Sequence, residues 1–162
     1  SGIGLMVSWS SPIMPEIYYR ENPFEKESVW DFSRTTPDIV VVNLMQNDCA
    51  LVNMPDYDQF KIRFGKNPPT EAFIINAYKE FISKIRKHYP RANIICTLGS
   101  MEATKPGSLW PGYIEKAVSA LNDKNIYTHF FPYINVDRHP NLKEHRQMSE
   151  QLNRFIETHF KW

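Results

Sequence analysis

PDIVVVNLMQND, residues 37–48, is the segment on which the expected fold of this chain depends. Its residues 39–42 are an unbroken β-branched run, which is typical of a parallel strand covered on both faces. Pro37 suits the entry to a strand, where no ladder N–H is needed. The segment then turns polar, at Asn43, Gln46, Asn47 and Asp48. Because open parallel sheets bind ligands outside the carboxyl ends of their strands, Asn47 and Asp48 are candidate site residues. The alternative is a helix cap or turn, positions that both residue types favour.

The rest of the chain alternates between short apolar runs and segments with helical periodicity. Strands are predicted near residues 39–44, 92–98 and 125–130, and helices near residues 70–88, 112–122 and 141–160. Residues 1–28 and 49–69 are punctuated by glycine and proline, which predicts irregular structure there. The alternation predicts an α/β fold with a parallel sheet and right-handed crossovers. No linker or internal repeat interrupts it, so residues 1–162 are expected to form a single domain.

Composition excludes several classes of protein. Of the 162 residues, 42% are hydrophobic and 14% aromatic, as in a globular domain. A net charge of +1 without a dense basic run gives no electrostatic case for nucleic acid. No apolar run approaches the ~18 residues of a membrane span. The two cysteines, Cys49 and Cys96, form no CxxC motif and are expected to be buried free thiols. Neither a cofactor nor a metal is expected.

A second candidate site lies in VDRHPN, residues 136–141. Asp137 and His139 are two apart in an extended segment, which puts their side chains on roughly the same side. A carboxylate beside an imidazole can fix its tautomer and stabilise the imidazolium. The alternative is a surface Asp-x-His at the start of the last helix. His145 is predicted to share the apolar face of that helix as a core histidine, which argues against a metal site with Asp137 and His139.

Three blocks of the sequence occur in an order that points to one family. They are SGIGL at residues 1–5, the PD-apolar-NL strand with its MQND turn, and VDRHPN. Together they resemble the SGNH hydrolases, and most closely the family 2 carbohydrate esterases of the acetylxylan esterase type. The resemblance runs along essentially the whole chain. It implies a flavodoxin-like parallel sheet sandwiched by helices, the SGNH hydrolase fold.

The same resemblance implies roles for individual residues. His139 would be the general base and Asp137 its orienting acid. The single residue between them resembles family 2, because other members of the superfamily have two. Asn47, through its side-chain amide, and Gly2, through its backbone N–H, would form the oxyanion hole. The family's usual glycine two places before that asparagine is Met45 here, which alters the expected turn and the size of the substrate pocket. Met45 is therefore a candidate substrate-binding residue.

Aromatic residues are candidates for contacts with a sugar. Trp110 stands where related esterases carry an aromatic residue beside the active site, and an indole face can stack on a sugar ring. An equally open alternative is that Trp110 anchors the helix that follows it. Trp9 is a weaker candidate of the same kind. Asp48 is expected to have a structural role, tying its loop together through backbone N–H groups.

The serine nucleophile of an SGNH hydrolase is missing from the sequence. Neither a G-D-S block nor G-x-S-x-G occurs in it. The resemblance implies that the nucleophile and the N-terminal strands lie upstream of residue 1, and that this chain alone is inactive. In the strand order 2-1-3-4-5, the missing first strand would lie beside residues 39–42. Those residues would then form a bare sheet edge, which invites self-association.

The leading functional interpretation is a carbohydrate O-acetyl esterase that acts on acetylated plant polysaccharide or oligosaccharide. The expected partner is thus an acetylated glycan, and the family resemblance implies a secreted or periplasmic protein. One alternative is a non-catalytic carbohydrate-binding module derived from an esterase. Another is an esterase or lipase for small acyl esters without a sugar.

Overall fold

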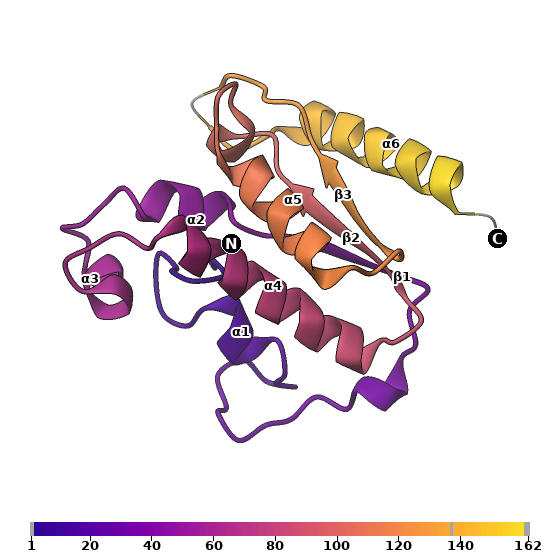
Figure 1. The fold of residues 1–162 in the computed structure, drawn as a ribbon, viewed down its shortest axis with the longest axis horizontal. Helices are drawn as coiled ribbons and strands as arrows, with labels where there is room; N and C mark the ends of the chain where they lie inside the picture. Colours follow the sequence, from indigo (N-terminus) through magenta and orange to yellow (C-terminus); the bar gives the residue numbers. More distant parts are fainter. Residues whose placement is uncertain (1, 137, 161–162) are drawn as a thin grey trace.

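The computed structural model describes residues 2–136 and 138–160 (Figure 1). Its helices are α1 (Met14–Ile17), α2 (Gln46–Leu51), α3 (Asp58–Phe64), α4 (Glu71–His88), α5 (Trp110–Leu121) and α6 (Leu142–His159). Its strands are β1 (Ile39–Asn43), β2 (Asn93–Leu98) and β3 (Ile126–Phe130). Two short 3₁₀ helices, η1 (Phe32–Arg34) and η2 (Glu102–Thr104), lie in connecting loops.

The three strands form one parallel sheet in the order β1-β2-β3. In its register Val42 of β1 lies beside Cys96 of β2, and Cys96 lies beside Thr128 of β3. The predicted parallel α/β architecture is therefore confirmed. Each predicted strand and long helix is present, with bounds that differ by at most two residues.

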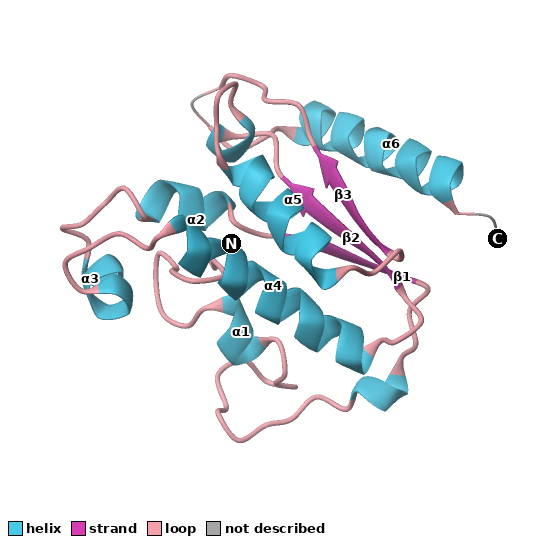
Figure 2. Ribbon diagram, viewed as in Figure 1, coloured by secondary structure: helices cyan, strands magenta, loops and turns pink. Residues whose placement is uncertain are grey.

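Helices cover both faces of the sheet (Figure 2). On one face Cys96 contacts Tyr78 of α4. On the other face the side chains of Tyr127 and His129 contact Phe155 of α6, with ring centroids 6.3 and 4.9 Å apart. Cys96 lies beside Thr128, and the side chains of Tyr127 and His129 point to the face opposite to that of Thr128, because side chains alternate along a strand. Helices α4 and α6 therefore cover opposite faces of the sheet. The predicted helical sandwich is thus present.

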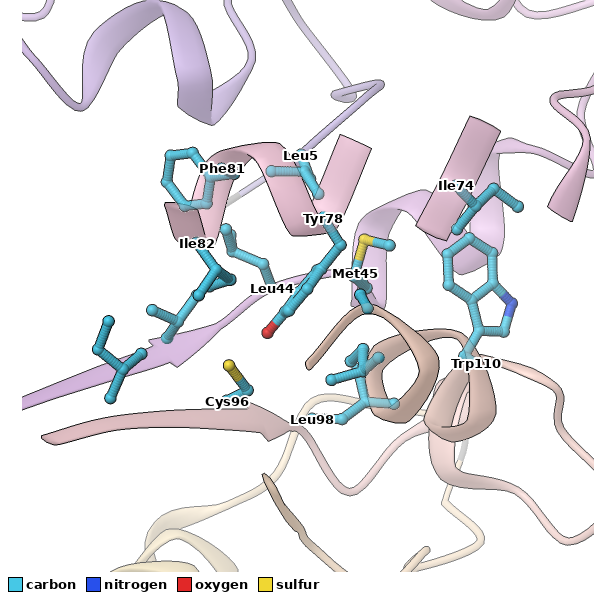
Figure 3. Packing of buried hydrophobic residues seen from close by; sticks show 14 of the residues in the cluster. Leu5, Leu44, Met45, Ile74, Tyr78, Phe81, Ile82, Cys96, Leu98 and Trp110 are labelled. Atoms are coloured by element: carbon cyan, nitrogen blue, oxygen red, sulfur yellow. The ribbon is translucent and has the colours of Figure 1, made fainter. Parts of the chain in front are cut away.

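The main hydrophobic core lies between the sheet and the pair α4 and α5 (Figure 3). Tyr78 and Ile82 of α4 are fully buried in it, together with Leu98 of β2. The thiol of Cys96 is buried there too, and its burial raises the pKa of Cys96 to about 12. Cys96 and Cys49 are both free thiols, as predicted, but only Cys96 is buried and Cys49 is half-buried.

Residues 49–69 were predicted to be irregular, and this prediction is wrong. They contain the end of α2 and the whole of α3. Phe60 of α3 is fully buried and packs on Phe64 with ring centroids 5.3 Å apart. A helix of two turns offers too short a window for its periodicity to stand out from the surrounding prolines and glycines.

The predicted orientation of the start of α6 is also wrong. His145 was expected to face inward, but it is exposed, and Leu142 three residues earlier is 88% exposed. The helix contacts the sheet through later residues, such as Phe155. Its first two turns instead border a cavity at the carboxyl end of the sheet.

Strand β1 lies at an edge of the sheet that the described residues form. Val41 of this strand is 44% exposed. A groove of about 260 Å³ follows the strand and is lined by Val40, Tyr18 and Phe81 among others. The bare aliphatic edge expected from the sequence is therefore present.

Candidate active site

A cavity of about 310 Å³ opens at the carboxyl end of the sheet. Asn47 borders it from the first turn of α2, and His139 borders it from the loop between β3 and α6. His145 and Met148 of α6 also line the cavity. The structure thus brings together two of the residues that the sequence predicted to act on one substrate, although 92 positions separate Asn47 from His139 along the chain.

Asp48 attaches the opening segment of the chain to α2. Its carboxylate accepts hydrogen bonds from the N–H groups of Leu5 (2.9 Å), Met6 (2.7 Å) and Val7 (3.1 Å). Burial raises the pKa of Asp48, and these three N–H groups oppose that rise. A Cβ at Gly4 would lie 1.9 Å from the Val7 carbonyl oxygen, so only glycine fits this turn. The structural role predicted for Asp48 is confirmed.

Two hydrogen bonds fix the orientation of the Asn47 amide. Trp9 Nε1–H donates to Asn47 Oδ1 at 3.1 Å, and Asn47 Nδ2 donates to the carbonyl oxygen of Ile3 at 2.9 Å. Gly2 belongs to the same group, because its carbonyl accepts from the Trp9 N–H at 2.9 Å. The opening segment and the turn after β1 therefore meet at the rim of the cavity, and the oxyanion-hole roles of Gly2 and Asn47 stay predictions.

His139 is exposed and precedes α6 by three residues. Asn141 is the N-cap of this helix, with its Oδ1 accepting from the Glu144 N–H at 3.0 Å. Asp137, the predicted orienting acid, lies outside the described residues. Its contact with the His139 ring therefore stays a prediction.

Comparison with known proteins identifies relatives along the whole chain. The cellulase/esterase CelE of Acetivibrio thermocellus is 29% identical over 174 aligned positions, which include all of this chain and 19% of CelE. A family two carbohydrate esterase from Clostridium thermocellum, solved in complex with cellohexaose, superimposes with a TM-score of 0.78 at 28% identity. That match covers 98% of this chain and 47% of the solved one.

The relatives of this chain are family 2 carbohydrate esterases. The resemblance read from the three sequence blocks is thereby confirmed. An acetyl xylan esterase from Butyrivibrio proteoclasticus has the same fold, with a TM-score of 0.77 at 22% identity over 98% of this chain and 50% of the esterase. No protein-family model matches the chain. The chain spans about half the length of these solved esterases.

Met45 occupies the position at which family 2 esterases were expected, from the sequence resemblance, to have a glycine. Its φ is +81°, in the left-handed region that favours glycine. The side chain of Met45 is fully buried and lies in the core near Tyr78 (Figure 3). Met45 is among the residues that line the cavity, while its side chain packs in the core, so its predicted contact with substrate stays a prediction.

Of the two tryptophans predicted to stack on a sugar, the structure favours Trp9 over Trp110. Trp110 is only 7% exposed, begins α5, and lies beside Ile74 in the core (Figure 3). It lines a separate cavity of about 450 Å³ rather than the one that His139 borders. Its prediction as a glycan platform is therefore wrong, and the alternative of a helix anchor fits. Trp9 is 42% exposed and its indole N–H is hydrogen-bonded to Asn47, so part of its side chain is exposed beside the site.

Sequence reasoning missed the contribution of α6 to the cavity. His145 was assigned to the core, yet it borders the cavity with Met148. Met148 is held to the β2 loop by a hydrogen bond of 3.4 Å from Ser100 Oγ to its sulfur. The N-cap residue Asn141 is the sequence signal that could have placed His145 at the cavity. It starts α6 two residues after His139, so the first turns of the helix lie beside the cavity that His139 borders.

Two classes of site are not found in the part of the chain that the structure describes. Within residues 2–136 and 138–160, no group of three or more His, Cys, Asp or Glu side chains could hold a metal ion. None of the helices among these residues has the length and apolar character needed to cross a membrane.

Proposed function

We propose that this chain is the base-bearing portion of a carbohydrate O-acetyl esterase whose serine nucleophile lies outside residues 1–162. The observation that carries the proposal is the meeting of Asn47 and His139 at one cavity. The cavity lies at the carboxyl end of a parallel sheet, where α/β enzymes bind their ligands. The sequence and fold similarity to carbohydrate esterases supports the same reading.

In the proposed mechanism His139 accepts the proton of the serine as its oxygen attacks the acetyl carbonyl carbon. Asp137 stabilises the resulting imidazolium. The Asn47 amide and the Gly2 N–H donate hydrogen bonds to the tetrahedral oxyanion, a contribution typically worth ~10²–10³ in rate per donor. His139 then protonates the departing sugar oxygen as the C–O bond breaks. A water molecule, deprotonated by His139, hydrolyses the acetyl-serine and releases acetate.

A carbohydrate is the substrate class that the rim of the cavity favours. Trp9 offers an exposed indole face, and its orientation is held from two sides. Its Nε1–H donates to Asn47, and its carbonyl accepts from the Tyr57 hydroxyl. The Tyr57 ring packs edge-on against it, with centroids 5.6 Å apart. A rigid aromatic surface of this kind suits stacking on a sugar ring beside the scissile ester.

The test is acetate release from acetylated xylo-oligosaccharide. The chain alone should release none, because it has no G-D-S block to supply the nucleophile that His139 would activate. A chimaera that adds the G-D-S-bearing portion of a related esterase should release acetate. His139→Ala in the chimaera should lower kcat by about 10³-fold or more, in line with the loss of a triad member. Release by the chain alone that survives His139→Ala would refute the proposal.

A non-catalytic carbohydrate-binding module is the second candidate. The aromatic rim at Trp9 favours it, because that surface needs no nucleophile. Titration with cellohexaose distinguishes the two functions. Under the binding hypothesis the sugar binds the chain, and the chimaera still releases no acetate. Turnover of p-nitrophenyl acetate without turnover of acetylated oligosaccharide would indicate an esterase for small acyl esters instead.

The site of action follows from the proposed substrate. Plant polysaccharides lie outside the cells that degrade them, so we propose that the complete protein is secreted or periplasmic. The edge of β1 is proposed as a surface through which the chain associates with itself. Its motivation is the exposed Val41 and the groove beside it.

A further inference from the structure

Arg138 makes three hydrogen bonds immediately before the proposed base. Its Nη1 donates to the backbone carbonyl of His139 at 3.0 Å. The same Nη1 and the neighbouring Nη2 donate to the two carboxylate oxygens of Glu144, at 2.6 and 2.9 Å. The guanidinium therefore joins the main chain at His139 to the first turn of α6 by a two-pronged contact, the strong geometry for an arginine and a carboxylate.

Glu144 is itself fixed on the helix. Its Oε2 accepts from the Asn141 N–H at 2.7 Å, and its own N–H donates to Asn141 Oδ1 at 3.0 Å. These two bonds form a capping box at the start of α6. The Arg138 guanidinium, helped by the Asn141 N–H, lowers the pKa of Glu144 to about 2. Glu144 thus stays ionised at any pH at which an esterase would work.

His139 needs such support because its ring is exposed. Surrounding side chains do not bury it, so its position depends on the course of the backbone. Pro140 restrains that backbone from one side, since the residue before a proline is confined to extended conformations. The Arg138 contact restrains it at the carbonyl. Together they limit where the imidazole can lie relative to the Asn47 side of the cavity.

We propose that Arg138 is a positioning residue: anchored on Glu144, it holds the main chain of His139 so that the imidazole stays at the cavity. The proposal rests on the proposed function, in which His139 is the base. The competing role for an arginine at this rim is direct binding of an anionic sugar. The contacts disfavour that role, because Nη1 and Nη2 both donate to Glu144 and its carboxylate balances the charge of the guanidinium.

The first test is kinetic and uses the esterase chimaera. Arg138→Ala should lower kcat by about 10- to 100-fold with KM within about twofold, since a small displacement of a catalytic group costs up to about 10² in rate. Arg138→Lys should recover only part of the loss, because an ammonium cannot bridge both oxygens of Glu144. Loss of affinity for acidic sugars alone, with kcat for neutral ones unchanged, would assign Arg138 to substrate binding and overturn the proposal.

Glu144→Gln separates positioning from helix capping. Glutamine can still accept the Asn141 N–H in a capping box, but it removes the charge that anchors the guanidinium. Glu144→Gln should therefore lower kcat in the same direction as Arg138→Ala, and the double variant should be no worse than Arg138→Ala alone. Additive losses would contradict action through one contact. Arg34→Ala is the matched control, because Arg34 pairs with Glu21 at 3.3 Å on the surface away from the cavity.

The second test needs no turnover. Ring NMR signals of His139 in the chain should report one orientation in the wild type and conformational averaging in Arg138→Ala, while Arg34→Ala leaves them unchanged. Unchanged His139 signals in Arg138→Ala would overturn the proposal even if the chimaera is active. If the chimaera releases no acetate, the proposed function fails, and the NMR comparison still decides whether Arg138 positions His139.

Discussion

At the scale of single residues, Met45 shows a conflict between backbone and side chain. Its φ of +81° disfavours any residue with a Cβ, by roughly 1–2 kcal/mol. Its side chain, however, is fully buried in the core. Loss of a buried methionine side chain costs about 2–5 kcal/mol, so the packing outweighs the strain. This explains how a methionine can occupy a turn that favours glycine.

Paired substitutions at Met45 test that explanation. Met45→Ala should lower the free energy of unfolding by about 2–5 kcal/mol, because the core loses the side chain and the strain remains. Met45→Gly empties the same space but relieves the backbone, so it should be more stable than Met45→Ala by about 1 kcal/mol. Urea denaturation measures both. An alanine variant as stable as the glycine variant would show that the left-handed turn carries no strain.

At the scale of elements, one ion pair joins the two short helices α1 and α3. Helices of this length are not stable by their own helix propensity and depend on tertiary contacts. Arg63 of α3 contacts Glu16 of α1 at 2.7 Å. The hydrogen bond from Arg63 lowers the pKa of Glu16 below its usual value of 4.5. An acid whose pKa is lowered on folding stabilises the protein above its unfolded pKa, and this stabilisation is lost as the pH falls through the folded pKa.

Glu16→Gln should therefore lower the free energy of unfolding at pH 7 by up to about 1 kcal/mol, the range for partly exposed pairs. The difference from the wild type should shrink as the pH falls below about 4.5, where Glu16 of the unfolded chain becomes protonated. Denaturation at several pH values measures it. Glu21→Gln is the control, since Glu21 pairs with Arg34 on the exposed surface. A difference that grows in acid would contradict the sign argued here.

At the scale of the whole molecule, the aliphatic edge at β1 is the feature expected to govern association. Unpaired N–H and C=O groups beside an exposed valine offer a template for another strand. Val41→Lys should lower the fraction of dimer or larger species in sedimentation experiments, because a charge on an edge opposes pairing. Val29→Lys is the control, since Val29 is exposed but lies outside the sheet. A wild type that stays monomeric at high concentration would refute association through β1.

The sequence by itself determined the parallel α/β fold, the three strands, the long helices and the structural role of Asp48. These depend on local signals: β-branched runs, helical periodicity and a carboxylate suited to backbone N–H groups. The sequence blocks also placed Asn47 and His139 at strand ends, and strand ends of a parallel sheet meet at one edge.

Only the tertiary structure decided which side chains face the cavity. It turned Met45 and Trp110 into the core and exposed His145 and Trp9. The physical reason is that the direction of a side chain at a loop or a helix end depends on what packs around it, and those neighbours are distant in the chain. The contacts of Arg138 with Glu144, which span a loop and a helix cap, likewise came from the folded structure.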